Sequence, residues 1–404
     1  MNKGQIATLI RGLLIDLTGK PQTVVYQANG KTPDAAMPVK ISPQDAPETI
    51  ARIIGEAYAA WKEKNKALTA NEKEILLPSC IALSVNDTVD LYWTDSDLDS
   101  TRDRLTRRDA APRIESVAET GGTILPADRA TVVQNRIAVV TGGAQGIGEE
   151  IVRNLAAAGA IVFIADLNLE GAQTLAEKIN AAEQRTAALA VQVNVADEVS
   201  VEAMFNTVTE NAGGLDLCIS NAGVLKAGSV LEQELADFKF VTDINYTGFF
   251  VVSKFAGRIL KTQHHTAPRW KTDIIQINSK SGLEGSNKNG AYAGGKFGGI
   301  GLVASFAMEL IEYNVKVNAI CPGNFLDGPL WSHPEKGLFV QYLQTGKVPG
   351  AKTIADVRAF YESKVPMKRG CTGKDLVRAI FYAVEQEYET GQAIPVTGGQ
   401  VMLH

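Results

Sequence analysis

The sequence contains few residues of the kinds that hold metals or form disulfides, with four cysteines and four histidines among 404 residues. The cysteines lie far apart in the chain, at Cys80, Cys218, Cys321 and Cys371. None has the CxxC spacing of a zinc or redox site, and two lie within apolar runs, so we expect buried free thiols. The histidines also lack the spacing of zinc ligands. We therefore expect no metal centre.

The chain also lacks a strong excess of charge of either sign, with a formal net charge of -5. No long basic stripe occurs, which argues against nucleic acid or an anionic membrane as the principal partner. The apolar segment at residues 6–17 is interrupted by Arg11 and Asp16, unlike a signal-peptide core or a membrane span. We expect a cytoplasmic protein that does not cross a membrane.

The remaining composition, with 45% hydrophobic and 21% charged residues, is that of a globular protein long enough for two or three domains. Residues 22–27 suit a strand, and the apolar positions of residues 47–61 recur at helical spacing. Residues 80–85 and 88–93 have the pattern of a β-hairpin. We predict a small α+β domain over residues 1–93, whose role the sequence does not reveal.

Residues 94–134 are polar and charged, with arginines interleaved among aspartates. We predict a charged linker or an ordered strap there. The acidic run at residues 95–99 resembles the first half of a calcium loop, but Ser100 stands where glycine is needed and Thr106 where the bidentate acid should be. A solvated acidic turn is the favoured interpretation.

From about residue 135, apolar runs that suit buried strands alternate with helical patterns. About seven runs occur, namely IAVV, IVFIAD, AALAVQVNV, LDLCIS, IIQINS, VKVNAI and QAIPV. Such alternation predicts a doubly wound α/β fold with a parallel sheet, covering residues 135–404. We expect a helical lid inserted at about residues 325–365.

A glycine-rich turn, TGGAQGIG at residues 141–148, joins the first of these strands to a helix. Gly142, Gly146 and Gly148 allow a tight turn, a close approach to a pyrophosphate and close helix packing. The free N–H groups at the start of the helix, including that of Ile147, favour the phosphates. The turn predicts a dinucleotide site.

The next strand supports this prediction because it ends in Asp166, eighteen residues after Gly148. A carboxylate at this place accepts hydrogen bonds from the adenosine ribose and repels the 2′-phosphate of NADP. No basic residue compensates, since Gln145 lies in the turn and Leu167 follows the aspartate. We predict NAD as the cofactor. Further contacts are expected from the ends of later strands, at Asn194, Val195, Asn221, Ala222, Gly223, Pro322 and Gly323.

The stretch at residues 274–299 combines a strand, a polar loop and a helix, and it carries the candidate catalytic groups. Tyr292 and Lys296 are four residues apart and share one helix face, while Ser279 ends the strand. A phenol with a pKa near ~10 is a weak base, and an ammonium one turn away should lower that value. Ser279 can bond the reacting oxygen, and Asn245 can hold a water that connects Lys296 to solvent.

These residues together resemble the short-chain dehydrogenase/reductase family. The resemblance rests on TGxxxGxG at residues 141–148, NAG at 221–223, Asn245, Ser279 and YxxxK at 292–296, and it covers residue 136 to the end. It implies that Tyr292 is the acid/base, assisted by Lys296, Ser279 and Asn245. The segment after Pro322 and Gly323 departs from the family pattern, which leaves the contact to the nicotinamide carboxamide open.

Within the family, IIQINSKSG, GGKFGGIGL, VPMKRGC and TGQAIPVTGGQVM are similar to the enzymes that oxidise sugar alcohol phosphates to ketose phosphates. This resemblance implies sorbitol 6-phosphate as substrate and fructose 6-phosphate as product. A substrate phosphate needs a cation or a helix terminus. The candidates are Lys280, Lys288, Lys368 and Arg369. Trp331 and Phe339 are expected in an apolar wall of the lid.

Two other interpretations stay open. The first retains the chemistry but assigns an unphosphorylated polyol or a hydroxyacid as substrate. The second is an NAD-sensing regulator, whose N-terminal domain would bind a partner; the presence of all four catalytic groups disfavours it. The family resemblance also implies a homo-oligomer, a tetramer or a dimer, built through the helices that carry Asn245 and Tyr292.

Overall fold

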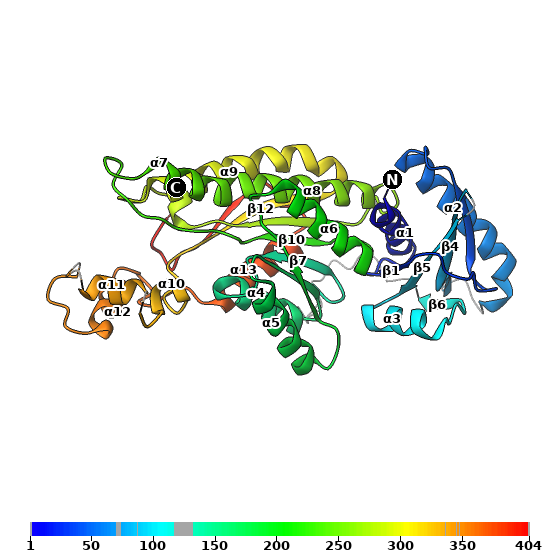
Figure 1. The fold of residues 1–404 in the computed structure, drawn as a ribbon, viewed down its shortest axis with the longest axis horizontal. Helices are drawn as coiled ribbons and strands as arrows, with labels where there is room; N and C mark the ends of the chain where they lie inside the picture. Colours follow the sequence, from blue (N-terminus) through cyan, green and yellow to red (C-terminus); the bar gives the residue numbers. More distant parts are fainter. Residues whose placement is uncertain are drawn as a thin grey trace.

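The computed structural model describes residues 2–69, 74–86, 88–116, 132–335, 337–344, 346 and 348–402. Two regions of regular structure lie side by side, each with its own sheet (Figure 1). We call residues 2–116 the N-terminal region and residues 132–402 the C-terminal region.

The C-terminal region is built on a parallel sheet of seven strands in the order β13-β12-β11-β10-β7-β8-β9. The strands are β7 (Ile137–Thr141), β8 (Ile161–Asp166), β9 (Ala188–Gln192), β10 (Leu217–Ser220), β11 (Thr272–Ile277), β12 (Val315–Pro322) and β13 (Ala393–Val396). The order reverses between β7 and β10, and a ligand crevice is expected outside the carboxyl ends of the strands at such a switch point. The predicted doubly wound fold is confirmed.

Helices cover both faces of this sheet (Figure 1). One face packs against α6 (Glu198–Ala212), α8 (Gly248–His264) and α9 (Gly290–Leu310), and the other against α4 (Gly146–Ala157), α5 (Leu169–Glu183) and α13 (Gly373–Glu385). Successive side chains of β7 alternate between the two cores, since Ile137 and Val139 lie in the first and Ala138 and Val140 in the second. This two-sided burial explains the continuous apolar runs of the strands.

Shorter helices and turns complete the region. They are α7 (Leu235–Thr242), the π-helical turn η3 (Asp243–Thr247), and the 3₁₀ turns η4 (Lys280–Gly282) and η5 (Ile311–Tyr313). The predicted lid forms α10 (Pro329–Ser332), α11 (Leu338–Gln344) and α12 (Ile354–Ser363). The lid has a small core of its own, which contains Leu326, Trp331, Phe339, Val348 and Val357.

By length and composition alone, Gly290–Tyr313 would also pass for a membrane span, with a mean hydropathy of 1.2. In the fold, this segment starts as α9 and packs along β12, where Ala291, Val303 and Ala307 are buried. Its outer face remains apolar, with Phe297 46% exposed and Met308 82% exposed.

The N-terminal region contains a four-stranded sheet in the order β1-β5-β4-β2. Its elements are α1 (Lys3–Thr18), β1 (Thr23–Gln27), β2 (Met37–Ile41), α2 (Pro47–Asn65), η1 (Lys66–Leu68), β3 (Glu74–Leu77), β4 (Cys80–Val85), β5 (Thr88–Asp95), α3 (Leu98–Arg107) and β6 (Arg113–Ser116). The predicted strand, helix and hairpin correspond to β1, α2 and the antiparallel pair of β4 and β5. The apolar segment at residues 6–17, which Arg11 and Asp16 interrupt, lies in α1.

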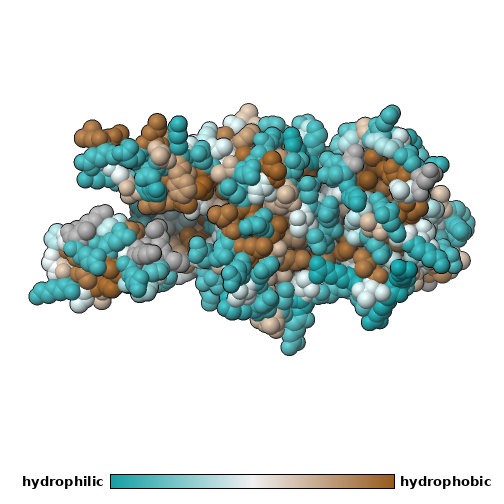
Figure 2. All heavy atoms as spheres, viewed as in Figure 1, coloured by the Kyte–Doolittle hydropathy of each residue, from teal (hydrophilic) through white to brown (hydrophobic). Residues whose placement is uncertain are grey.

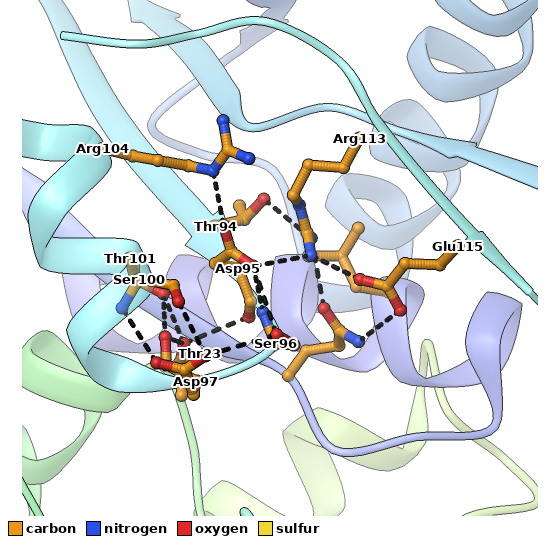
Figure 3. Close-up of polar contacts among 12 residues, drawn as sticks. Thr23, Thr94, Asp95, Ser96, Asp97, Ser100, Thr101, Arg104, Arg113 and Glu115 are labelled. Atoms are coloured by element: carbon orange, nitrogen blue, oxygen red, sulfur yellow. Dashed lines mark hydrogen bonds and ion pairs between the residues drawn. The ribbon is translucent and has the colours of Figure 1, made fainter. Parts of the chain in front are cut away.

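Residues 94–134 were expected to form a charged linker or an ordered strap, and the described part, residues 94–116, is ordered and continues the N-terminal region beyond residue 93. Residues 98–107 form α3 and residues 113–116 form β6, which pairs with β3, so both belong to the N-terminal region. Residues 117–131 lie outside the described residues. Charged residues of this segment form ion pairs with one another. Asp95 contacts Arg104 and, at 3.2 Å, Arg113 (Figure 3). The sequence could not show this, since β5, α3 and β6 meet only in the fold.

The acidic run at residues 95–99 also has a structural task. Asp97 is the N-cap of α3, where its Oδ1 accepts a hydrogen bond of 2.8 Å from the backbone N–H of Ser100. N-cap carboxylates satisfy N–H groups that the helix itself leaves free. Together with the Asp95 contacts, this makes the run part of the packing of α3.

The two regions meet where α1 packs on α6 and α8. Arg11 of α1 is fully buried and forms an ion pair with Asp216, which directly precedes β10. Further contacts include the Thr266 hydroxyl, which donates to the carbonyl of Leu9 at 2.8 Å. The N-terminal region therefore lies at the end of the sheet opposite the lid (Figure 1).

Candidate active site

A cavity of about 1020 Å³ lies at the carboxyl ends of the strands. It is lined by the glycine-rich turn, the ends of β8, β10, β11 and β12, the start of α9 and the lid. Figure 2 shows the molecule hollowed between the lid and the segment that carries α7. All sixteen predicted cofactor-site residues line this cavity, including Gln145, Ile147, Leu167, Asn194, Val195, Ala222, Gly223, Pro322 and Gly323.

The glycine-rich turn has the geometry that a dinucleotide phosphate requires. Gly142 and Gly146 adopt positive φ values of 62° and 59°, which other residues rarely adopt. A Cβ on Gly148 would lie 2.0 Å from the carbonyl oxygen of Gly142, so only glycine fits there. Helix α4 begins at Gly146 without a side-chain cap, which leaves its first N–H groups free for an anion.

Asp166 ends β8, and its carboxylate holds the backbone of the glycine-rich turn. Its Oδ2 accepts a hydrogen bond of 3.0 Å from the N–H of Ala144, and its Oδ1 accepts one of 2.9 Å from that of Asn168. A carboxylate has about four acceptor sites, so two remain for ribose hydroxyls. Leu167, next to it, is 67% exposed at the rim.

Asn221 holds the end of β10 against the turn. Its Nδ2 donates to the carbonyls of Thr141 at 2.9 Å and Gly142 at 3.0 Å, and the Thr141 hydroxyl accepts from the N–H groups of Asn221 and Ala222. The NAG turn thus positions the glycine-rich turn, and all three of its residues line the cavity.

Ser279, Tyr292 and Lys296 converge on the cavity as predicted. Ser279 is the N-cap of η4, where its Oγ accepts a hydrogen bond of 3.1 Å from the N–H of Ser281. Lys296 is buried and its Nζ donates to the carbonyl of Ile277 at 2.8 Å. The Lys296 Nζ lies 5.6 Å from the centre of the Tyr292 ring.

The expected lowering of the Tyr292 pKa by Lys296 is not seen. Burial raises the pKa of Tyr292 above its ordinary value, while the Ser279 hydroxyl acts in the opposite direction. Burial also lowers the pKa of Lys296, to about 8. Desolvation penalises the charged form of both groups, and the ammonium is directed at the Ile277 carbonyl instead of the phenol oxygen.

Asn245 lies in η3 and is 2% exposed. Its Oδ1 accepts from the N–H of Val224 and its Nδ2 donates to the Val224 carbonyl, both at 2.8 Å. The side chain therefore fixes the loop that follows the NAG turn. That Asn245 also holds a water next to Lys296 stays a prediction.

Asn278, which the sequence reasoning missed, joins the catalytic strand to the catalytic helix. Its Nδ2 donates to the carbonyl of Lys296 at 2.9 Å and to Gln276 Oε1 at 2.7 Å, and its Oδ1 accepts from the N–H of Ser279. Asn278 thus fixes the distance between Ser279 and α9. The only signal in the sequence was a polar residue between the apolar strand and Ser279.

Of the four cations expected to meet a substrate phosphate, only Lys280 lines the cavity. Its Nζ lies 3.1 Å from Glu284 Oε1, and its side chain is 25% exposed. Lys288 is exposed on the loop before α9, Lys368 donates to the carbonyl of Ser363, and Arg369 forms a bidentate ion pair with Asp375. None of these three residues lines the cavity in the structure, and local partners hold Lys368 and Arg369.

Trp331 lines the cavity as expected, whereas Phe339 is buried within the lid behind it. The two rings lie 5.2 Å apart, and the Tyr361 ring lies 4.8 Å from Trp331. Tyr342 and Tyr361 also line the cavity. The sequence reasoning missed both tyrosines, since α11 and α12 bring them to the cavity only once the lid has folded.

Three comparisons with known proteins agree with this geometry. The family model described as short chain dehydrogenase matches residues 136–333. Sorbitol-6-phosphate 2-dehydrogenase of Escherichia coli (strain K12) is 36% identical over 272 residues, which cover 67% of this chain and 100% of the relative. The chain belongs to the short-chain dehydrogenase/reductase family. The sequence resemblance to this family is confirmed.

Other members resemble the C-terminal region to similar extents. Meso-2,3-butanediol dehydrogenase of Serratia marcescens is 31% identical over 255 residues, 60% of this chain and 96% of the relative. The crystal structure of sorbitol-6-phosphate 2-dehydrogenase SrlD from Erwinia amylovora has a TM-score of 0.61 and 38% identity, and it covers 66% of this chain and 100% of that structure. The family model begins only at residue 136, so the N-terminal region is an addition to the family fold.

The family and the site together define the class of reaction. The protein is an oxidoreductase that acts on CH–OH groups of small molecules with a nicotinamide dinucleotide, NAD or NADP. The residues present fit that cofactor, because the glycine turn offers free N–H groups and Asp166 offers carboxylate oxygens at the ribose position.

Proposed function

We propose that this protein is an NAD-dependent dehydrogenase that oxidises a sugar alcohol phosphate to a ketose phosphate. Sorbitol 6-phosphate and fructose 6-phosphate are the pair that we propose first. The observation that carries the proposal is the presence of Ser279, Tyr292, Lys296 and Lys280 around one cavity. The likeness to two sorbitol-6-phosphate 2-dehydrogenases over their whole length supports the same substrate.

The preference for NAD over NADP is inferred from charge. Asp166 carries its negative charge where the 2′-phosphate of NADP would lie. Gln145, Leu167 and Asn168, its neighbours in the cavity lining, are uncharged. Among the described residues, the cations that line the cavity are Lys280 and Lys296, and both lie beside Ser279 and Tyr292. A 2′-phosphate would therefore meet repulsion without compensation.

In the proposed mechanism, the substrate hydroxyl lies between Ser279 and Tyr292. Ser279 orients the oxygen, and the Tyr292 phenolate takes the hydroxyl proton. A nicotinamide dinucleotide held by the glycine-rich turn and Asp166 would accept the hydride from the same carbon. The products are the ketone, the reduced cofactor and a neutral Tyr292. To stabilise the phenolate, the Lys296 ammonium must leave the Ile277 carbonyl, to which it donates in this structure, and turn towards the phenol oxygen. In the reverse direction, Tyr292 returns the proton to the ketone oxygen.

Lys280 is the proposed contact for the substrate phosphate. It follows Ser279 directly, and its ion pair with Glu284 is partly exposed. Exposed ion pairs contribute little to stability, so the ammonium can exchange the carboxylate for a phosphate. This exchange would make Lys280 the residue that distinguishes the phosphorylated from the free polyol.

The ion pair between Lys280 and Glu284 also favours a second candidate substrate, an unphosphorylated polyol. Lys280 already has an acidic partner, and Lys296, the other cation of the described cavity lining, is directed at Ile277. A neutral polyol needs no cation. The similarity to a meso-2,3-butanediol dehydrogenase is compatible with such a substrate.

Steady-state rates distinguish a phosphorylated from an unphosphorylated polyol as the substrate. We expect kcat/KM with NAD to be at least about 10-fold higher for sorbitol 6-phosphate than for sorbitol, which corresponds to one charge-assisted contact. Lys280→Ala should remove this ratio, whereas the matched control Lys288→Ala, outside the cavity, should leave it intact. Equal values for the two alcohols in the wild type would reject the phosphate and favour the neutral polyol.

We further propose that the protein is a homo-oligomer, built through the outer faces of α8 and α9. Phe250 and Phe297 are 45% and 46% exposed, and Met308 is 82% exposed. Gly294 and Gly301 lie on open surface of α9, so another helix can approach closely. Exposed apolar surface of this kind indicates a protein interface. Light scattering would test the assembly.

A further inference from the structure

Asn289 occupies the N-cap position of α9, three residues before Tyr292. An asparagine at this position usually accepts a hydrogen bond from an N–H of the first helical turn. The side chain of Asn289 makes no such bond. Its amide group is therefore available for another purpose, at a place directly beside the catalytic tyrosine.

The amide oxygen of Asn289 is buried and has no hydrogen-bond partner among the residues that the structure describes. On the other side of the amide, Nδ2 lies 3.5 Å from the Oγ of Ser286, at the limit of a hydrogen bond. Both residues line the cavity together with Ser279 and Tyr292. A buried acceptor without a donor is unfavourable, so this oxygen requires a donor that the described part of the chain does not supply.

The position of Asn289 is fixed by its backbone. Its carbonyl accepts a hydrogen bond of 2.9 Å from the N–H of Ala293, the first bond of α9. A bridge pairs Asn289 with Gly228, whose N–H donates to the carbonyl of Lys288 at 2.9 Å. The side chain thus projects from a rigid backbone without contributing to its stability.

We propose that the Oδ1 of Asn289 accepts a hydrogen bond from a substrate hydroxyl adjacent to the reacting carbon, which makes Asn289 a specificity-determining residue for polyols. A carbonyl oxygen only accepts, so it fits an O–H donor and not an ionised phosphate oxygen. Asn289 precedes Tyr292 by three residues and both line the same cavity, so a substrate that reacts at Tyr292 can present a neighbouring hydroxyl to this acceptor. The inference rests on the proposed function and orients the substrate, with its polyol end at Asn289.

The test compares kcat/KM for sorbitol 6-phosphate with that for its 1-deoxy and 3-deoxy analogues, in the wild type and in Asn289→Leu. In the wild type, we expect one analogue to be poorer by about 10- to 100-fold, because it leaves the buried oxygen without a donor. In Asn289→Leu, this ratio should fall to about one. The matched control Asn287→Leu, on the exposed loop outside the cavity lining, should keep the wild-type ratio.

Two further measurements separate recognition from folding. NADH binding and the melting temperature should not change in Asn289→Leu, since the side chain makes no cap bond. Asn289→Asp, which retains the acceptor, should restore the ratio between sorbitol 6-phosphate and its deoxy analogues. The inference is overturned if the wild type does not distinguish the analogues, or if Asn289→Leu keeps the wild-type ratio.

The test of Asn289 can be decided even if the proposal of a phosphorylated substrate fails. If the wild type oxidises sorbitol as well as sorbitol 6-phosphate, the phosphate recognition fails. The same ratios, measured with sorbitol and its deoxy analogues, then still decide the role of Asn289, because the hydroxyl contact does not involve the phosphate.

Discussion

Arg11 and Asp216 form a bidentate ion pair in which both side chains are fully buried. The Nη1–Oδ1 distance is 3.1 Å and the Nη2–Oδ2 distance is 2.6 Å. Asp216 also accepts from the N–H of Ile137 and from the indole N–H of Trp270, both at 2.8 Å. An arginine of the N-terminal region therefore neutralises a carboxylate that organises the start of β7 and β10.

We predict that Arg11→Ala lowers the free energy of unfolding by about 3–5 kcal/mol, because the Asp216 charge stays buried without a partner. Urea unfolding of the complete chain measures this change. The control is Arg52→Ala, whose ion pair with Glu56 is more than 60% exposed, and which should cost less than about 1 kcal/mol. A loss below about 1 kcal/mol for Arg11→Ala would contradict the importance of the pair.

For catalysis, we predict that Tyr292→Phe lowers kcat by about 10²- to 10⁴-fold, the usual range for loss of a general acid/base. NADH binding, followed by fluorescence, should persist because the ring remains. Tyr313→Phe, at the other end of the same helical segment, is the matched control and should retain activity. Full activity of Tyr292→Phe would exclude the phenol from proton transfer.

The pH dependence of activity should reflect the effect of burial on the pKa values of Tyr292 and Lys296. Burial raises the pKa of Tyr292, so the phenolate needed for oxidation is scarce at neutral pH and increases with pH. We expect kcat/KM for oxidation to rise from pH 6 towards pH 8. Above pH 8 the rise should flatten, because burial lowers the pKa of Lys296 to about 8 and its charge is then lost. Ketone reduction should decline over the same range; a flat profile would contradict both assignments.

Replacement of Asp166 should change cofactor choice. In Asp166→Asn, an amide oxygen can still accept from Ala144 or Asn168, but the charge that repels a 2′-phosphate is gone. We predict that the ratio of kcat/KM for NAD over NADP falls by about 10- to 100-fold, equivalent to about 1.4–2.8 kcal/mol. Asp197→Asn, which changes the N-cap of α6 outside the cavity lining, is the control. An unchanged ratio would show that Asp166 does not select the cofactor.

Much of the C-terminal fold could be predicted because its signals are local. Buried parallel strands appear as continuous apolar runs, and the turn at residues 141–148 requires glycine at fixed places. The N-terminal region was less predictable. Arg104 and Arg113 looked like solvated charges of a linker, and Arg11 looked like an interruption of an apolar segment. Their partners, Asp95 and Asp216, are distant in sequence or in another element, so only the fold reveals these contacts.

The candidate site shows the same division. Ser279, Tyr292 and Lys296 could be predicted because their spacing is fixed by one strand and one helix. Asn278 and Asn289 could not, since asparagines are common in such loops and their importance depends on which hydrogen bonds are made or left open. The pKa of Tyr292 also depends on burial, which spacing alone does not reveal.

The buried contact between α1 and the start of β10 makes the N-terminal region more than an attached module. Removal of residues 2–116 would open apolar surface of α6 and α8 to water and leave the Asp216 carboxylate without its arginine at the amino end of β10, opposite the cofactor cleft. The catalytic half could not simply be excised for study or engineering. Its resistance to heat or denaturant depends on the N-terminal region, of which no described residue lines the cavity. Unfolding of this enzyme is therefore controlled from the end of the molecule opposite the active site.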